Sequence, residues 1–115
     1  MIPPLEVRKR RPVRFVYPNG HEELLDLGDE VGVDASYSYG EYRFLFQWLE
    51  SRSSGGPVIR AAYYRKPPDS ERWYFASQFT LTAERKHWVE LLARAFKKDP
   101  AIKSEIEEAV SRIDA

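Results

Sequence analysis

The chain has 115 residues, 43% of them hydrophobic and 31% charged, which is the size and composition of one globular domain. Cysteine is absent, which excludes disulfides, thiolate metal sites and a cysteine nucleophile. The net charge is zero, no apolar run is long enough to cross a bilayer and the N-terminus shows no signal peptide, so we expect a cytoplasmic protein without membrane association.

The charges are distributed unevenly along the chain. Residues 1–20 carry five basic and one acidic side chains, residues 21–41 carry seven acidic and no basic ones, and residues 42–75 carry six basic and three acidic ones. A local basic patch can bind a polyanion even when the whole molecule is neutral. The chain also has one Met, one Asn and two Gln, and such sparse use of thermolabile residues indicates a thermophilic source.

Residues 1–12 are expected to form a flexible basic arm, and residues 13–115 a single α+β domain that binds nucleic acid. The run Arg8-Lys9-Arg10-Arg11 suits nonspecific phosphate contacts, although a solvated tail has the same composition. The β-rich run 13–17 predicts a strand that ends in the turn Pro18-Asn19-Gly20.

Residues 21–41 are interrupted by three glycines, so we expect loop and short strand there. The clustered carboxylates of this stretch are ligands that hard cations accept, but their spacing matches no EF-hand loop. A solvated acidic edge is therefore favoured, and no metal or other cofactor is expected.

Three strands are predicted next, over residues 42–49, 58–65 and 72–81, joined by short turn-forming segments into an antiparallel meander. Thr82 is the expected N-cap of a helix with an apolar stripe, and Asp99-Pro100 marks the start of a second helix. The predicted fold is thus α+β, with an antiparallel sheet of about four strands packed on C-terminal helices.

Alternation of side chains predicts which strand face contacts a ligand. Arg60 and Tyr64 share one face of the middle strand and Arg72 and Tyr74 one face of the last, so we expect them to form one exposed platform. Rings and guanidinium groups stack on unpaired bases, although Tyr and Arg are also ordinary residues on the solvent face of a sheet. The candidate nucleic-acid-binding residues are Arg10, Arg11, Arg43, Phe44, Phe46, Trp48, Arg60, Tyr64, Arg72 and Tyr74.

Aromatic and basic strands followed by the run Leu81-Thr82-Ala83-Glu84-Arg85-Lys86-His87-Trp88-Val89-Glu90-Leu91-Leu92 resemble the ThermoDBP family and its related proteins, over roughly residues 10–98. This resemblance implies an archaeal single-stranded DNA-binding protein without enzymatic activity. A second likeness is to the positive-cofactor-four type of coactivator, but Trp88 here follows Glu84 by four residues rather than two.

The sequence therefore predicts sequence-independent binding of single-stranded DNA or RNA, through aromatic stacking and Arg and Lys contacts with phosphates. No catalytic motif is present, so an enzyme is not expected; a nuclease that uses Asp26, Asp29 or Asp34 is a minor alternative. The main alternative is a protein-interaction module that acts through the acidic stretch and the last helix, where a stripe at Ile102, Ile106, Val110 and Ile113 would suit a homodimer.

Overall fold

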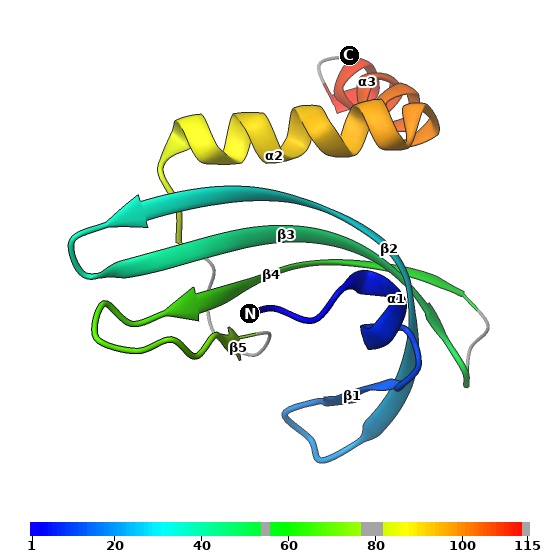
Figure 1. The fold of residues 1–115 in the computed structure, drawn as a ribbon. Helices are drawn as coiled ribbons and strands as arrows, with labels where there is room; N and C mark the ends of the chain where they lie inside the picture. Colours follow the sequence, from blue (N-terminus) through cyan, green and yellow to red (C-terminus); the bar gives the residue numbers. More distant parts are fainter. Residues whose placement is uncertain (54–55, 77–81, 114–115) are drawn as a thin grey trace.

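A computed structural model of the chain describes residues 1–53, 56–76 and 82–113. Within these ranges the strands form one antiparallel sheet in sequence order, and three helices complete the fold (Figure 1). The strands are β1 (Val13–Val16), β2 (Glu22–Tyr37), β3 (Gly40–Ser51), β4 (Pro57–Lys66) and β5 (Tyr74–Ala76), and the helices are α1 (Leu5–Arg8), α2 (Arg85–Lys98) and α3 (Pro100–Ile113). The predicted α+β meander with C-terminal helices is confirmed, with five strands rather than about four.

The sheet is curled, and its two faces pack against different helices (Figure 1). The short helix α1 lies inside the curl, on what we call the concave face, where Leu5 packs on Leu25, Leu27 and Leu49. The longer helix α2 lies over β2 and β3 on the opposite side, which we call the α2 face. The core of that face consists of Val33, Ala35, Phe44 and Leu91.

The stretch expected to be loop and short strand is instead the longest strand of the described sheet, β2. Several of its carboxylates pair with basic side chains on neighbouring strands, on a loop and on α2, and these carboxylates remain partly exposed to solvent. These ion pairs are Arg14–Glu22, Arg52–Asp26, Arg43–Asp34 and Lys98–Asp29. Gly28 and Gly32 lie within this strand and do not end it. Gly32 pairs with Leu45 at close range, where an added Cβ atom would lie 3.2 Å from the leucine side chain.

A β-bulge between Leu27 and Asp29 changes which residues of β2 face each side of the sheet. Leu25 and Leu27 point to the concave face before it, whereas Val31 and Val33 point to the α2 face after it. A bulge inserts one unpaired residue, so it shifts the alternation by one and bends the strand. Gly28 is that residue, and the sheet curls in this part of β2 (Figure 1).

The N-terminal segment differs from the flexible arm that was expected. Residues 5–8 form α1, Leu5 belongs to the concave core, and Arg8 donates hydrogen bonds to Glu30. Arg10 and Arg11 follow the helix and are exposed. Apolar burial and a charged pair therefore hold this segment on the sheet.

The C-terminal helices begin at different kinds of residue. Helix α2 starts at Arg85, with Glu84 rather than Thr82 at the N-cap position, because residues 82–84 are extended or irregular. Helix α3 has the predicted start, since the Ile102 amide is 3.4 Å from the Asp99 carboxylate. No helix in the described ranges is long and apolar enough to cross a membrane. Of the strand predicted over 72–81, residues 77–81 lie outside the described residues.

Candidate nucleic-acid interface

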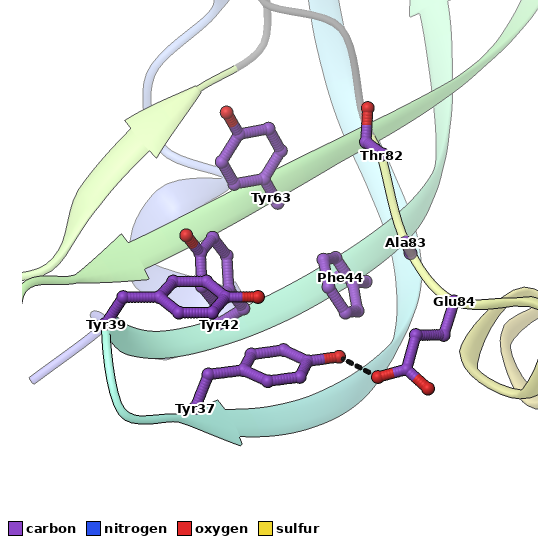
Figure 2. A pocket seen from close by; sticks show the side chains of 8 residues that line it. All are labelled: Tyr37, Tyr39, Tyr42, Phe44, Tyr63, Thr82, Ala83 and Glu84. Carbon is purple, nitrogen blue, oxygen red and sulfur yellow. Dashed lines mark hydrogen bonds between the residues drawn. The ribbon is translucent and has the colours of Figure 1, made fainter.

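A pocket of about 450 Å³ opens on the α2 face, beside the tip of the β2–β3 hairpin (Figure 2). Four tyrosines supply most of its wall, a phenylalanine lies among them, and the segment that leads into α2 closes one side. Its lining residues are Tyr37, Tyr39, Tyr42, Phe44, Tyr63, Thr82, Ala83 and Glu84. We call this site the tyrosine pocket.

The rings of the pocket contact each other and fix each other's orientation. Tyr37 and Tyr39 are stacked, with ring centroids 5.0 Å apart and planes within 5°. Tyr42 meets Tyr37 edge to face at 6.0 Å and lies 6.0 Å from the ring of Tyr63. Aromatic pairs in such arrangements stabilise each other beyond their buried area, so the rings are held in place before any ligand binds.

The hairpin tip depends on a glycine that no other residue could replace without strain. Gly40 opens β3 with φ of 149°, and a Cβ atom there would lie 3.0 Å from the Lys66 carbonyl oxygen. This turn carries Tyr39, the most exposed ring of the pocket at 57%. The close approach of the two strands also lets Arg65 donate a hydrogen bond to the Tyr39 carbonyl, at 3.0 Å.

Polar groups from α2 complete one side of the pocket. The Tyr37 hydroxyl donates a hydrogen bond of 2.8 Å to the Glu84 carboxylate and lies 3.3 Å from His87 Nδ1. The hydrogen bond to Glu84 raises the pKa of Tyr37 to about 12, and the same bond lowers the pKa of Glu84. Glu84 is therefore an ionised acceptor at the pocket wall, and Tyr37 is a neutral donor.

Two arginines lie beside the pocket on the same face. The register pairs Tyr42 with Arg65 and Arg65 with Tyr74, so the three side chains form a row across β3, β4 and β5. The Arg65 guanidinium lies 5.9 Å from the Tyr42 ring centroid, and its Nε donates to the Tyr42 hydroxyl at 3.1 Å. Arg72 lies 5.1 Å from the ring centroid of Tyr74, which is 48% exposed.

The structure does not bring the predicted platform of Arg60, Tyr64, Arg72 and Tyr74 together. Tyr64 pairs with Phe75, whereas Tyr74 pairs with Arg65, so Tyr64 and Tyr74 point to opposite faces of the sheet. Phe75, which shares the face of Tyr64, is 41% exposed. The prediction aligned the two strands one residue out of register, and a shift of one residue exchanges the faces.

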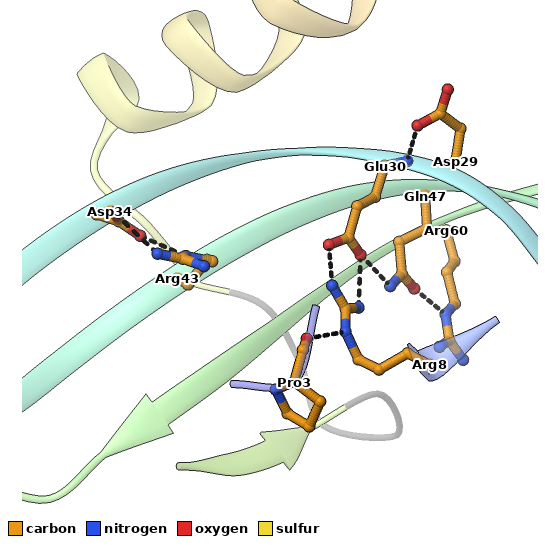
Figure 3. A network of polar contacts seen from close by, with 8 residues as sticks. All are labelled: Pro3, Arg8, Asp29, Glu30, Asp34, Arg43, Gln47 and Arg60. Carbon is orange, nitrogen blue, oxygen red and sulfur yellow. Dashed lines mark hydrogen bonds and ion pairs between the residues drawn. The ribbon is translucent and has the colours of Figure 1, made fainter. Parts of the chain in front are cut away.

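Arg43 and Arg60 lie on the concave face, near Arg8 of α1 (Figure 3), and Tyr64, which pairs with Arg43, lies on the same face. Arg60 donates to Gln47 Oε1 at 2.7 Å, and the Gln47 amide donates to Glu30 at 2.9 Å. Burial lowers the pKa of Arg60. Arg43 pairs with Asp34, so both arginines that were predicted to contact a ligand here are engaged by polar side chains of the sheet.

Three predicted aromatic contacts on β3 point to the α2 face. Phe44 is buried at 3% exposure and forms part of the pocket wall, while Phe46 packs against the core of this face. The Trp48 indole nitrogen donates a hydrogen bond of 3.0 Å to Asp99, the residue that caps α3. Phe44 therefore borders the pocket, and Trp48 joins the sheet to the junction of the two helices.

Sequence reasoning omitted most of the pocket from the candidate residues. Tyr37, Tyr39 and Tyr63 were not among them, nor were Glu84, His87 or Arg65. The available signal was the run Tyr37-Ser38-Tyr39-Gly40-Glu41-Tyr42, in which three tyrosines surround a glycine. In the described ranges, no three His, Asp or Glu side chains lie close enough to hold a metal ion.

In comparisons with protein-family models, with curated proteins and with solved structures, no match to the chain was found. The resemblance to the ThermoDBP family stays a prediction from the sequence.

Proposed function

We propose that the chain binds single-stranded nucleic acid on the α2 face, across a tyrosine surface that consists of Tyr37, Tyr39, Tyr42, Tyr63 and Tyr74. The observation that carries this proposal is the gathering of these five rings around and beside one pocket, with Arg65 and Arg72 at its edge. Aromatic side chains stack on unpaired bases at ~1–3 kcal/mol per base, and arginines contact phosphates and ring faces.

The charges near this surface set how strongly salt should weaken binding. Arg65 and Arg72 lie on the tyrosine surface, whereas Arg8, Arg43 and Arg60 lie on the concave face. Each phosphate contact with a single strand contributes a slope of about −0.7 to log K against log salt. Two contacts therefore give a slope of about −1.4, and stacking supplies the remaining affinity.

The experiment is fluorescence anisotropy with labelled oligo-dT, oligo-U and a DNA duplex over a series of salt concentrations. Both single strands should bind with the shallow salt slope, and the duplex should bind much more weakly because its bases are already stacked. Equal binding of duplex and single strand would contradict the proposal. A slope steeper than about −4 would mean that several further phosphates are bound outside the tyrosine surface. The exposed Arg10 and Arg11, which the sequence predicts to contact phosphates, would then be the first residues to test.

A second candidate function, protein binding through α3, is supported by one observation. Ile106, Val110 and Ile113 on this helix are 42%, 52% and 80% exposed, which leaves an apolar stripe open to solvent. The acidic half of the predicted interaction surface lacks such support, because its carboxylates are paired within the chain. A homodimer through α3 is tested by sedimentation equilibrium of the chain and of Val110→Glu, which should then be monomeric.

A further inference from the structure

The tyrosine pocket offers a base more than flat ring faces, because its wall includes a carboxylate that accepts hydrogen bonds, that of Glu84. The Glu84 carboxylate has one oxygen that accepts the Tyr37 hydroxyl at 2.8 Å, and its other oxygen lies 3.7 Å from the exposed Lys86 ammonium. An ionised carboxylate has about four lone-pair positions, so acceptor capacity is left over. The side chain makes no capping hydrogen bond to α2, so the helix amides do not take up this capacity.

Nucleobases differ in the hydrogen-bonding groups that they present along one edge. Guanine places two donors side by side, N1–H and the N2 amino group, and a carboxylate can accept both at once. Adenine and cytosine place one amino group beside a ring acceptor, and thymine and uracil place one N–H between two carbonyl oxygens. A carboxylate repels each of those neighbouring acceptors, so guanine is the base whose edge fits it best.

We infer that the tyrosine pocket is a subsite for one base of the bound strand and that Glu84 makes it prefer guanine. This inference rests on the proposed function, which requires only stacking, and adds a base preference to it. In this arrangement the base stacks on the tyrosine rings and directs its N1–H and N2 amino group to the Glu84 carboxylate. Guanine should then be favoured over other bases at this one position by about tenfold.

An aromatic pocket with a carboxylate would also suit a methylated ammonium group, as in trimethyllysine. The surroundings of Tyr42 favour the base instead. The Arg65 guanidinium already lies over the Tyr42 ring at 5.9 Å and donates to its hydroxyl, so a cation in the pocket would meet a positive charge nearby. A neutral base meets no such repulsion, and the arginine remains able to contact the adjoining phosphate.

The test uses the full chain and labelled ten-nucleotide dT strands in which one central position is dT, dG, deoxyinosine, dA or dC. Deoxyinosine keeps N1–H and lacks the N2 amino group, so it isolates the second donor. The variant is Glu84→Gln, which retains an acceptor for the Tyr37 hydroxyl but presents an amide donor to the base. Its matched control is Glu90→Gln on the exposed side of α2, where the carboxylate pairs with Arg94 at 2.9 Å.

The expected result is about tenfold tighter binding of the dG strand, most of which is lost with deoxyinosine and in Glu84→Gln but kept in Glu90→Gln. Thermal unfolding of both variants checks that they remain folded. If all strands bind with equal affinity, the base preference is overturned and the proposed function stands. If no strand binds, the proposed function itself fails. Binding of a trimethyllysine peptide that depends on Glu84 would overturn the inference in favour of a cation site.

Discussion

The Tyr37 hydroxyl donates a hydrogen bond of 2.8 Å to the Glu84 carboxylate, and this contact joins the end of β2 to the residue that precedes α2. The two residues are 47 positions apart in the sequence. The contact holds the segment that closes one side of the tyrosine pocket, and titration of Tyr37 reports whether this hydrogen bond is formed.

The first prediction concerns the alkaline titration of Tyr37. Its pKa is raised from 10.0 to about 12 by the bond to Glu84, so the folded state keeps a proton that the unfolded state releases between these values. Stability from this bond should be complete below pH 10 and should be lost as pH rises toward 12. Phenolate absorbance should show a tyrosine that titrates near pH 12, and this component should be lost in Tyr37→Phe and titrate earlier in Glu84→Gln. The pKa values of Tyr17 and Tyr64 are also raised, so their titrations above pH 10 should remain in both variants. A component near pH 12 that is unchanged in Tyr37→Phe would contradict the assignment.

The second prediction separates the two faces of the sheet. Tyr74→Ala should weaken single-strand binding by ~1–3 kcal/mol and hardly change the melting temperature, because this ring is exposed on the α2 face. Tyr64→Ala should leave binding unchanged and cost about 1–3 kcal/mol of stability, because its ring packs on Phe75 at 4.9 Å beneath Arg8. The reverse pattern in anisotropy and thermal unfolding would place the ligand on the concave face.

The control for loss of a stacking ring is Tyr17→Ala. Tyr17 is 39% exposed just after β1 and donates to Glu23, outside the tyrosine surface. Its removal should leave single-strand affinity unchanged. A loss equal to that of Tyr74→Ala would mean that binding follows any exposed aromatic residue rather than this surface.

The third prediction concerns the pair of Arg8 and Glu30, whose side chains are 15% and 12% exposed. Burial raises the pKa of Glu30, but hydrogen bonds from Arg8 and Gln47 outweigh it, and the net pKa is lowered. The pair therefore stabilises the fold above the ordinary carboxyl pKa of 4.5, and this contribution is lost as pH falls through the lower folded value. Arg8→Met should cost about 3 kcal/mol near neutral pH, because it leaves a buried charge without its partner.

Denaturant unfolding between pH 3 and pH 7 measures this cost, and NMR titration should show the Glu30 pKa rising in the variant. Lys9→Met is the control, because Lys9 pairs with exposed Glu6 at 3.7 Å and its loss should cost less than about 0.5 kcal/mol. If Arg8→Met behaves like Lys9→Met, then α1 does not stabilise the sheet and residues 1–12 act as the arm expected from the sequence.

The fourth prediction concerns Asp99, which caps α3 and accepts the Trp48 indole N–H. Asp99→Ala should cost about 1–2 kcal/mol of stability and change the near-ultraviolet dichroism of the indole, since it removes a cap and a hydrogen-bond partner. Single-strand affinity should stay the same. A loss of affinity without unfolding would return Trp48 to the ligand contacts predicted from the sequence.

Local chemistry predicted the parts of this fold that depend on neighbouring residues. Asp99-Pro100 identified the start of α3, because a capping carboxylate followed by proline acts within one turn. Alternation within β4 was likewise correct, since Ile59 and Tyr63 share one face and Arg60 and Tyr64 the other. The prediction failed where the relation between strands mattered, because the pairing of Tyr64 with Phe75 depends on how residues 67–73 turn.

The tyrosine pocket could be predicted only in part for the same reason. The three tyrosines near Gly40 are neighbours in sequence, but Tyr63 and Glu84 reach them through strand pairing and through the path into α2. The position of α1 is equally a matter of tertiary structure, since the burial of Leu5 requires Leu25 and Leu49 to be brought together first. No local pattern distinguishes such a helix from a basic tail.

The bulge at Gly28 determines which face of the sheet each later side chain of β2 points to. Because Gly28 is left unpaired as a bulge, Tyr37 lies on the same side as Tyr42 and Tyr63. If Gly28 were instead paired as an ordinary strand residue, with the pairing to β1 unchanged, alternation would direct Tyr37 into the curl. One bulged position thus decides which face of the sheet the side chains of the hairpin tip occupy. The position of the proposed ligand surface outside the curl is therefore decided nine residues before its first tyrosine, at a site that no ligand would touch.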